Sequence, residues 1–178
     1  MRNTWIRRIS AIRKDGVESA INLTCGLNCI IGASNTGKTR IAKTVEFACG
    51  GKELPFTDKT AYEIAQVTFV TNGGEVSLSR SIHVQNTIHV KSSNPMIVPG
   101  SYSVSSRAGK SINTVLLALL GVESTRRIAT NETYHTVAFT WNAIRHLMIV
   151  PEDQIGRARP SILFPKSTSL ATLTQSLS

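Results

Sequence analysis

The sequence predicts an α/β fold, and three observations lead to that prediction. A glycine-rich loop at residues 32–39 stands between a short apolar run and a segment with helical spacing. Two strand-like segments precede this loop, and several alternating segments follow it. The first pattern is typical of a strand–loop–helix unit, whereas the other two indicate an antiparallel β meander beside it.

Length and composition limit the classes of protein to consider. The chain has 178 residues, of which 41% are hydrophobic, so it is long enough for one domain with a core of its own. No apolar run approaches the roughly 18 residues of a membrane span. The first residues also lack the apolar centre of a signal peptide. We therefore expect a cytoplasmic protein without a membrane partner.

The net charge of +9 is the most informative compositional feature. An excess of Lys and Arg favours anionic partners such as nucleic acid. The basic residues are scattered, however, with short clusters only at Arg7-Arg8, Arg13-Lys14 and Arg126-Arg127. A solvated basic surface is an equally good interpretation.

Three segments lead into the loop. Residues 5–12 mix apolar and basic side chains, as expected for a strand with one wet face. The Asp15-Gly16 pair predicts a turn, and residues 19–23 predict a second, antiparallel strand. Residues 27–31 are apolar and β-branched toward their end, which predicts a buried strand entering the loop.

The three cysteines carry no metal-binding or disulfide pattern. Their number is odd, and no His or Cys partner falls at zinc-ligand spacing. Cys25 and Cys29 flank the predicted strand at residues 27–31. We expect them to be small buried residues.

The loop itself matches the pattern G-x-x-x-x-G-K-T. Its residues are Gly32, Ala33, Ser34, Asn35, Thr36, Gly37, Lys38 and Thr39. Successive backbone N–H groups and the N-terminus of the following helix make such a loop a binding site for a di- or triphosphate. Lys38 can reach the β- and γ-phosphates, and the Thr39 hydroxyl can bind Mg²⁺. The predicted ligands are therefore ATP and Mg²⁺.

The glycines and the asparagine of the loop have backbone roles. Gly32 and Gly37 allow positive φ and a close approach of the backbone to phosphate oxygens. Asn35 occupies a position where many ATPases with this loop carry glycine, and asparagine tolerates a left-handed backbone. Beyond the loop, apolar residues at helical spacing within residues 41–48 predict a helix, which the pair Gly50-Gly51 ends.

The rest of the chain predicts a meander and two helices. Residues 63–70 and 76–82 alternate as strands do, joined by the turn Asn72-Gly73-Gly74, with Val76, Leu78 and Arg80 on one face. The remaining predicted segments are a short strand at 87–90, an exposed loop at 92–110, a helix at 112–120, a helix near 141–146, a helix end or short strand at 147–150, and a Ser/Thr-rich, disordered tail at 166–178.

These motifs together resemble the N-terminal half of an ABC-type ATPase head. The resemblance is to the SMC, RecF, RecN and SbcC-like group of P-loop NTPases, and it covers residues 4–165. We expect residues 1–165 to form one lobe. It implies ATP binding in a protein that acts on DNA, in repair or in defence against foreign DNA. In that family a second lobe supplies a signature motif, Walker B acids and a switch histidine, and a dimer of heads encloses two ATP molecules.

This chain departs from the family pattern in its second half. No Ser-Gly-Gly signature is present, and no sustained heptads follow residue 165. The sequence therefore resembles half of a head, which implies a separate second lobe or a homodimer as partner. Nucleotide binding is implied by the loop; hydrolysis is implied only where a second lobe completes the site.

Residues 152–154 hold the weaker catalytic and metal-binding candidates. Glu152 and Gln154 follow the apolar residues 147–150, as a Q-loop does in the family, where a polar side chain reaches the metal and the attacking water. Alternatively, Glu152 or Asp153 is the metal-binding acid of a Walker B strand, although Pro151 separates the acids from the apolar run. A plain surface turn is the third interpretation.

The histidines and the first arginines have simpler interpretations. His83, His89, His135 and His146 match no catalytic pattern, so structural roles are expected. Arg7, Arg8 and Arg13 could contact phosphate or DNA, but surface residues that keep their charge in water are the favoured interpretation. Two alternatives to an ATPase lobe remain: a non-catalytic nucleic-acid-binding or assembly module, and a small self-sufficient P-loop kinase or nucleotidase.

Overall fold

The structure is a computed structural model that describes residues 4–57, 60–105, 108–123, 127–129 and 136–150. The chain divides into two compact units, Met1–Gly121 and Val122–Ser178. Among the helices that the structure describes, none has both the length and the apolar character needed to cross a membrane. The predicted lobe boundary after residue 165 and the predicted tail at 166–178 lie outside the described residues.

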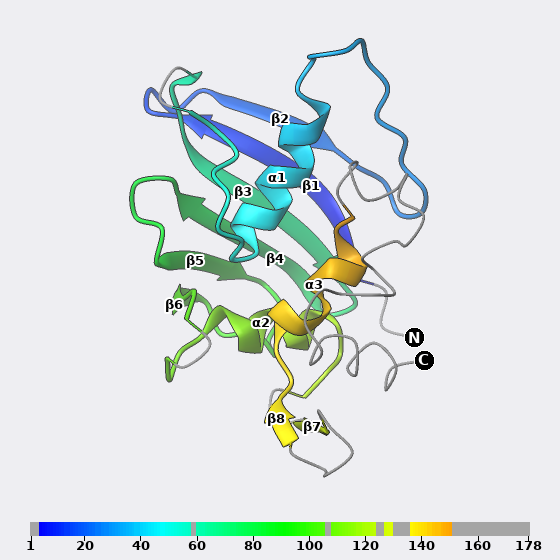
Figure 1. The fold of residues 1–178 in the computed structure, drawn as a ribbon, viewed down its shortest axis with the longest axis vertical. Coiled ribbons are helices and arrows are strands. Elements are labelled where there is room, and N and C mark those ends of the chain that lie inside the picture. The colour runs from blue at the N-terminus through cyan, green and yellow to red at the C-terminus, as the bar shows by residue number, and fades with distance from the viewer. Residues whose placement is uncertain (1–3, 58–59, 106–107, 124–126, 130–135, 151–178) are drawn as a thin grey trace. The chain divides into compact units, whose positions relative to one another are not determined.

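The first unit is a mixed α/β fold built on one six-stranded antiparallel sheet (Figure 1). Neighbouring strands follow the order β2-β1-β3-β4-β5-β6, so β1 lies between β2 and β3. The strands are β1 (Trp5–Arg13), β2 (Glu18–Asn22), β3 (Tyr62–Thr71), β4 (Gly74–Ser81), β5 (Thr87–Ser92) and β6 (Gly100–Ser103). The predicted strand preface and the predicted meander are both confirmed as parts of this sheet.

The long helix α1 (Lys38–Ala48) lies across one face of the sheet (Figure 1). Period-two alternation in the strands points Ile9, Val67 and Leu78 to a common face, and all three are buried. The buried Ala48 of α1 packs with Ile9 and Val67. Apolar side chains from a helix and from one sheet face thus form the core of this unit.

A second, short helix follows the sheet. Helix α2 (Ile112–Leu119) begins at Ser111, whose side chain accepts a hydrogen bond of 3.2 Å from the Asn113 N–H. Most of its residues are apolar and buried, and its backbone ends at Leu120. The predicted helix before Gly121 is confirmed.

The second unit contains a small hairpin and one helix. Strands β7 (Arg127–Ala129) and β8 (Thr136–Ala138) pair antiparallel, and α3 spans Trp141–Met148. The sequence does not predict this hairpin, because each strand has only three residues and shows no period. The helix near residues 141–146 is confirmed. Leu147 and Met148 belong to this helix, so the alternative of a strand at 147–150 is wrong.

The exposed loop predicted at residues 92–110 contains regular structure in its described residues, 92–105 and 108–110. They contain β6, which pairs with β5, and the side chain of Tyr102 is buried there. The Tyr102 hydroxyl donates to the Val98 carbonyl oxygen at 2.6 Å. Serine and glycine in this segment suggested a loop, but a strand of four residues with one buried aromatic side chain is enough to extend the sheet.

Candidate functional site

The glycine-rich loop leads directly into α1. Its last two residues, Lys38 and Thr39, already lie in the first turn of the helix, and Gly37 is the N-cap residue. The predicted order of loop and helix is therefore confirmed. Each of the eight predicted residues is exposed except Gly37, which is partly buried: Gly32, Ala33, Ser34, Asn35, Thr36, Gly37, Lys38 and Thr39.

Two residues of the loop have a left-handed backbone. Asn35 has φ 63° and Gly37 has φ 89°. The expectation that Asn35 would accept the left-handed region in place of glycine is confirmed. Gly32 has no positive φ; a side chain there would meet Thr36 Oγ1 at 2.9 Å from its Cβ, so its role is close approach.

The side chain of Lys38 folds back over its own loop. Its Nζ donates to the carbonyl oxygens of Gly32, at 2.7 Å, and Ala33, at 2.6 Å. Thr36 Oγ1 also donates to the Ala33 carbonyl oxygen, at 2.8 Å. The two bonds from Nζ hold the Lys38 ammonium group against the first two residues of the loop.

The start of α1 can accept a further anionic or metal-bound group. No side chain caps this N-terminus, and the first turn contains no acidic residue. The Arg40 N–H bonds to the Gly37 carbonyl oxygen at 2.9 Å, which tightens the first turn. Thr39 is exposed in that turn, where its hydroxyl is open to a metal ion beside a bound phosphate. The residues present therefore fit Mg·ATP.

The strand predicted ahead of the loop is absent, and this expectation is wrong. Residues 27–31 are exposed and outside any strand; Leu27 is 98% exposed and Ile31 is 89% exposed. Among the described residues, no backbone–backbone hydrogen bond involves residues 27–31. The apolar pattern is that of a buried strand, but a strand needs a paired neighbour, and the described sheet is completed without it.

The cysteines near this segment are also placed differently from the prediction. Cys25 and Cys29 are exposed, because the strand expected to bury them does not form. Cys49, after the end of α1, is buried. Burial, with a smaller effect of the Glu46 charge, raises the pKa of the Cys49 thiol to about 12. Cys49 is therefore a packed, unreactive residue.

The catalytic candidates after α3 cannot be placed. Glu152, Asp153 and Gln154 lie outside the described residues, so both the Q-loop and the Walker B interpretations stay predictions. Within the part of the chain that the structure does describe, no cluster of three or more His, Cys, Asp or Glu side chains could hold a metal ion.

The histidines that the structure describes have local partners. His83 Nε2 lies 3.6 Å from Glu63 Oε1, and His89 Nδ1 lies 3.0 Å from Ser101 Oγ. The contact between His83 and Glu63 was not predicted from the sequence. It depends on the pairing of β3 with β4, which brings the carboxylate next to the imidazole ring. His135 and the side chain of His146 lie outside the described residues.

Arg7, Arg8 and Arg13 each form an ion pair with an acid. Arg7 pairs with Glu75, Arg8 with Glu18, and Arg13 with Asp15. These pairs neutralise much of the basic character that the first strand shows in the sequence. The net charge of +9 therefore does not form an anion-binding cluster at these three positions.

No protein-family model matches the chain, and no curated protein matches it either. The geometry of the loop and its surroundings is thus the basis on which a function can be proposed.

Proposed function

We propose that residues 32–39 bind Mg·ATP and that the chain acts as the N-terminal lobe of an SMC-like ATPase head. One observation carries this proposal: the ammonium group of Lys38 lies over the carbonyl oxygens of Gly32 and Ala33, at the start of an uncapped helix. Lys38 would hold the β- and γ-phosphates, and Thr39 would bind Mg²⁺.

The exposed segment before the loop supports the need for a second lobe. Residues 27–31 have the composition of a buried strand, yet their backbone pairs with no described residue. A parallel strand from another lobe would satisfy those backbone groups and cover Leu27 and Ile31. An acid from that lobe would then activate the attacking water. The chain alone is expected to bind nucleotide without steady turnover.

The nucleotide site is tested by calorimetry with Mg·ATP on three proteins. Lys38→Ala removes an ammonium group from the loop, and Lys43→Ala removes the same group one turn further along α1, where Lys43 pairs with Glu53 at 3.0 Å. We expect Lys38→Ala to weaken binding about tenfold to a hundredfold, as the loss of charge-assisted hydrogen bonds implies. Lys43→Ala should bind as the wild type does. Equal losses in both variants would contradict the site.

A role on DNA is the second part of the proposal. The net charge of +9 supports it, although Arg7, Arg8 and Arg13 are paired with acids. Binding to duplex DNA should weaken steeply between low and physiological salt. DNA binding together with no measurable affinity for Mg·ATP would instead favour a non-catalytic nucleic-acid-binding module.

A further inference from the structure

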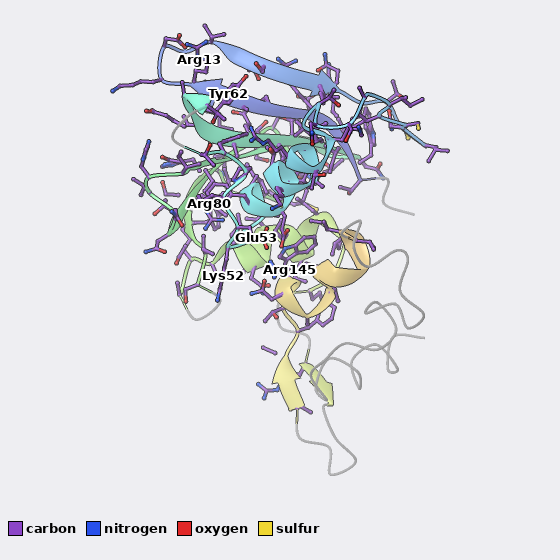
Figure 2. All side chains as sticks on the ribbon, turned by 45° about the horizontal axis from the view of Figure 1, so that its top comes forward. Arg13, Lys52, Glu53, Tyr62, Arg80 and Arg145 are labelled. Atoms are coloured by element: carbon purple, nitrogen blue, oxygen red, sulfur yellow. The ribbon has the colours of Figure 1, made fainter. Side chains whose placement is uncertain are left out.

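A buried arginine is bonded to the far end of the helix that the loop begins. Arg80 lies on β4, opposite Ala65 of β3, and is only 4% exposed. Figure 2 shows it beside the end of α1, where Lys52 and Glu53 follow the helix. The sequence places Arg80 on one face with the apolar Val76 and Leu78, a position at which a cation needs partners.

The guanidinium group of Arg80 meets those needs with backbone carbonyls. Nη1 donates to the carbonyl oxygens of Phe47, at 2.6 Å, and Gly51, at 2.7 Å. Nε and Nη2 both donate to the Gln85 carbonyl oxygen, at 2.8 and 2.6 Å. The Phe47 ring lies beneath the group, with its centroid 4.0 Å from Cζ. One side chain thus joins α1, the segment after it and the β4–β5 turn.

Arg80 bonds to α1 at the C-terminal end of the helix, where the last carbonyl groups have no partner within the helix. The Gly50 N–H bonds to the Phe47 carbonyl oxygen and the Gly51 N–H to that of Glu46, which closes the helix end. Arg80 adds a second donor to Phe47 and places a positive charge at the negative end of the helix dipole. The helix is therefore held at its C-terminus by both backbone and side-chain donors.

The start of α1 has weaker support than its end. The buried residues of the helix are Thr44, Phe47 and Ala48, all in its C-terminal half. Residues 38–40 are exposed, and Ile41 packs only as a partly buried residue. Because the helix behaves as a rod of about 16 Å, a change in how its buried end is held moves the exposed end that carries Lys38 and Thr39.

We propose that Arg80 is a positioning residue for the phosphate loop. By fixing the C-terminal end of α1 against β4, it sets where Gly37, Lys38 and Thr39 lie relative to the sheet. This inference rests on the proposed binding of Mg·ATP to residues 32–39. It predicts that Arg80 controls nucleotide affinity without touching the nucleotide.

The test uses the full chain with two substitutions at Arg80 and one matched control. Arg80→Met keeps the length and removes the donors, whereas Arg80→Lys keeps the charge but cannot reach all three carbonyl groups together. Leu117→Ala, in the fully buried part of α2, lowers stability at a position outside the core clusters that contain Phe47 and Ala48 of α1. Each protein is compared by calorimetry with Mg·ATP and by hydrogen exchange without nucleotide.

The expected result separates positioning from general stability. Arg80→Met should weaken Mg·ATP binding about tenfold, the effect of losing one charge-assisted hydrogen bond between the displaced loop and the nucleotide. Arg80→Lys should weaken binding less. Amides of α1 should exchange faster in Arg80→Met while those of β3 remain protected. Leu117→Ala should unfold at a lower temperature but bind Mg·ATP as the wild type does.

Three outcomes overturn the inference. These are wild-type affinity in a folded Arg80→Met variant, unchanged exchange of α1 in that variant, and an equal loss of affinity in Leu117→Ala. If Arg80→Met does not fold, wild-type affinity in Arg80→Lys overturns it instead. Absence of Mg·ATP binding in the wild-type chain overturns the proposed function, and the exchange of α1 then decides separately whether Arg80 holds the helix.

Discussion

Lys38 Nζ lies 2.7 Å from the carbonyl oxygen of Gly32, so the last part of the loop is bonded to its first residue. A phosphate group that binds to Lys38 must compete with this bond and with the one to Ala33. The cost of breaking them is offset only by a ligand with several negative oxygens, which favours a di- or triphosphate over a single phosphate.

The left-handed N-cap makes Gly37 sensitive to substitution. Gly37→Ala places a Cβ at φ 89°, which costs about 1–2 kcal/mol. We expect lower stability in urea and weaker Mg·ATP binding. Asn35→Gly is the matched control, because φ 63° suits glycine at least as well as asparagine. A Gly37→Ala variant with wild-type stability would show that the loop has another conformation in solution.

The hydroxyl of Thr39 should govern the dependence on magnesium. Thr39→Val keeps the shape but removes the oxygen, whereas Thr39→Ser keeps the oxygen. Titration of ATP with and without Mg²⁺ should show a strong metal effect in the wild type and in Thr39→Ser. The effect should be nearly lost in Thr39→Val. A full metal effect in Thr39→Val would place the metal elsewhere.

Alkylation should distinguish the three cysteines. Cys25 and Cys29 are exposed, whereas Cys49 is buried, with its pKa raised to about 12 by that burial. Iodoacetamide at pH 8 should add two groups to the folded chain and three to the chain in denaturant, as counted by mass spectrometry. Rapid modification of Cys49 in the folded state would contradict the packing after α1.

The pH dependence of stability has one predicted contributor in the first hairpin. Arg8 donates two hydrogen bonds to the carboxylate of Glu18, from Nη2 to Oε2 at 2.8 Å and from Nε to Oε1 at 3.1 Å. These bonds lower the pKa of Glu18. A lowered folded-state pKa gives stability that is present above about pH 4.3, the unfolded value, and is lost as the pH falls further. The effect is small, because both side chains are about one-third exposed.

Urea unfolding of Glu18→Gln checks this contribution. The stability difference from the wild type should be larger at pH 7 than at pH 3. The same difference at both pH values would exclude a role for the ionised carboxylate.

Exposure predicts that the apolar segment before the loop adds little to the stability of the isolated chain. Ile31→Ser should change the free energy of unfolding by no more than about 0.5 kcal/mol, as a surface substitution does. Leu78→Ala, in the fully buried core, should cost about 2–5 kcal/mol. A large loss in Ile31→Ser would show that residues 27–31 are packed in solution.

Most of the sheet could be predicted because its signals are local. Alternation fixed residues 63–70 and 76–82 as strands, and the Asn72-Gly73-Gly74 turn fixed their pairing, with Thr71 opposite Gly74. The helix stop at Gly50-Gly51 is equally local. These features depend on residues that are close together in the sequence, so the sequence alone predicts them.

The remaining features depend on partners distant in sequence. An apolar run at residues 27–31 looks the same whether or not a neighbouring strand exists to cover it. Alternation along the strand predicts that Arg80 shares a face with apolar residues. Its carbonyl partners at Phe47 and Gly51 depend on how β4 packs against α1, which the sequence alone does not show. Likewise, the acids beside Arg7 and Arg8 come from other strands.

The segment between β2 and α1 joins two parts that are each held in place independently. β1 hydrogen-bonds to both β2 and β3, while α1 is bonded through Arg80 to β4. Proteolytic cleavage between Gly26 and Leu27 would therefore yield two fragments that stay associated. The first hairpin could be supplied as a separate peptide to the remainder of the chain, so the molecule is suited to fragment complementation at this position.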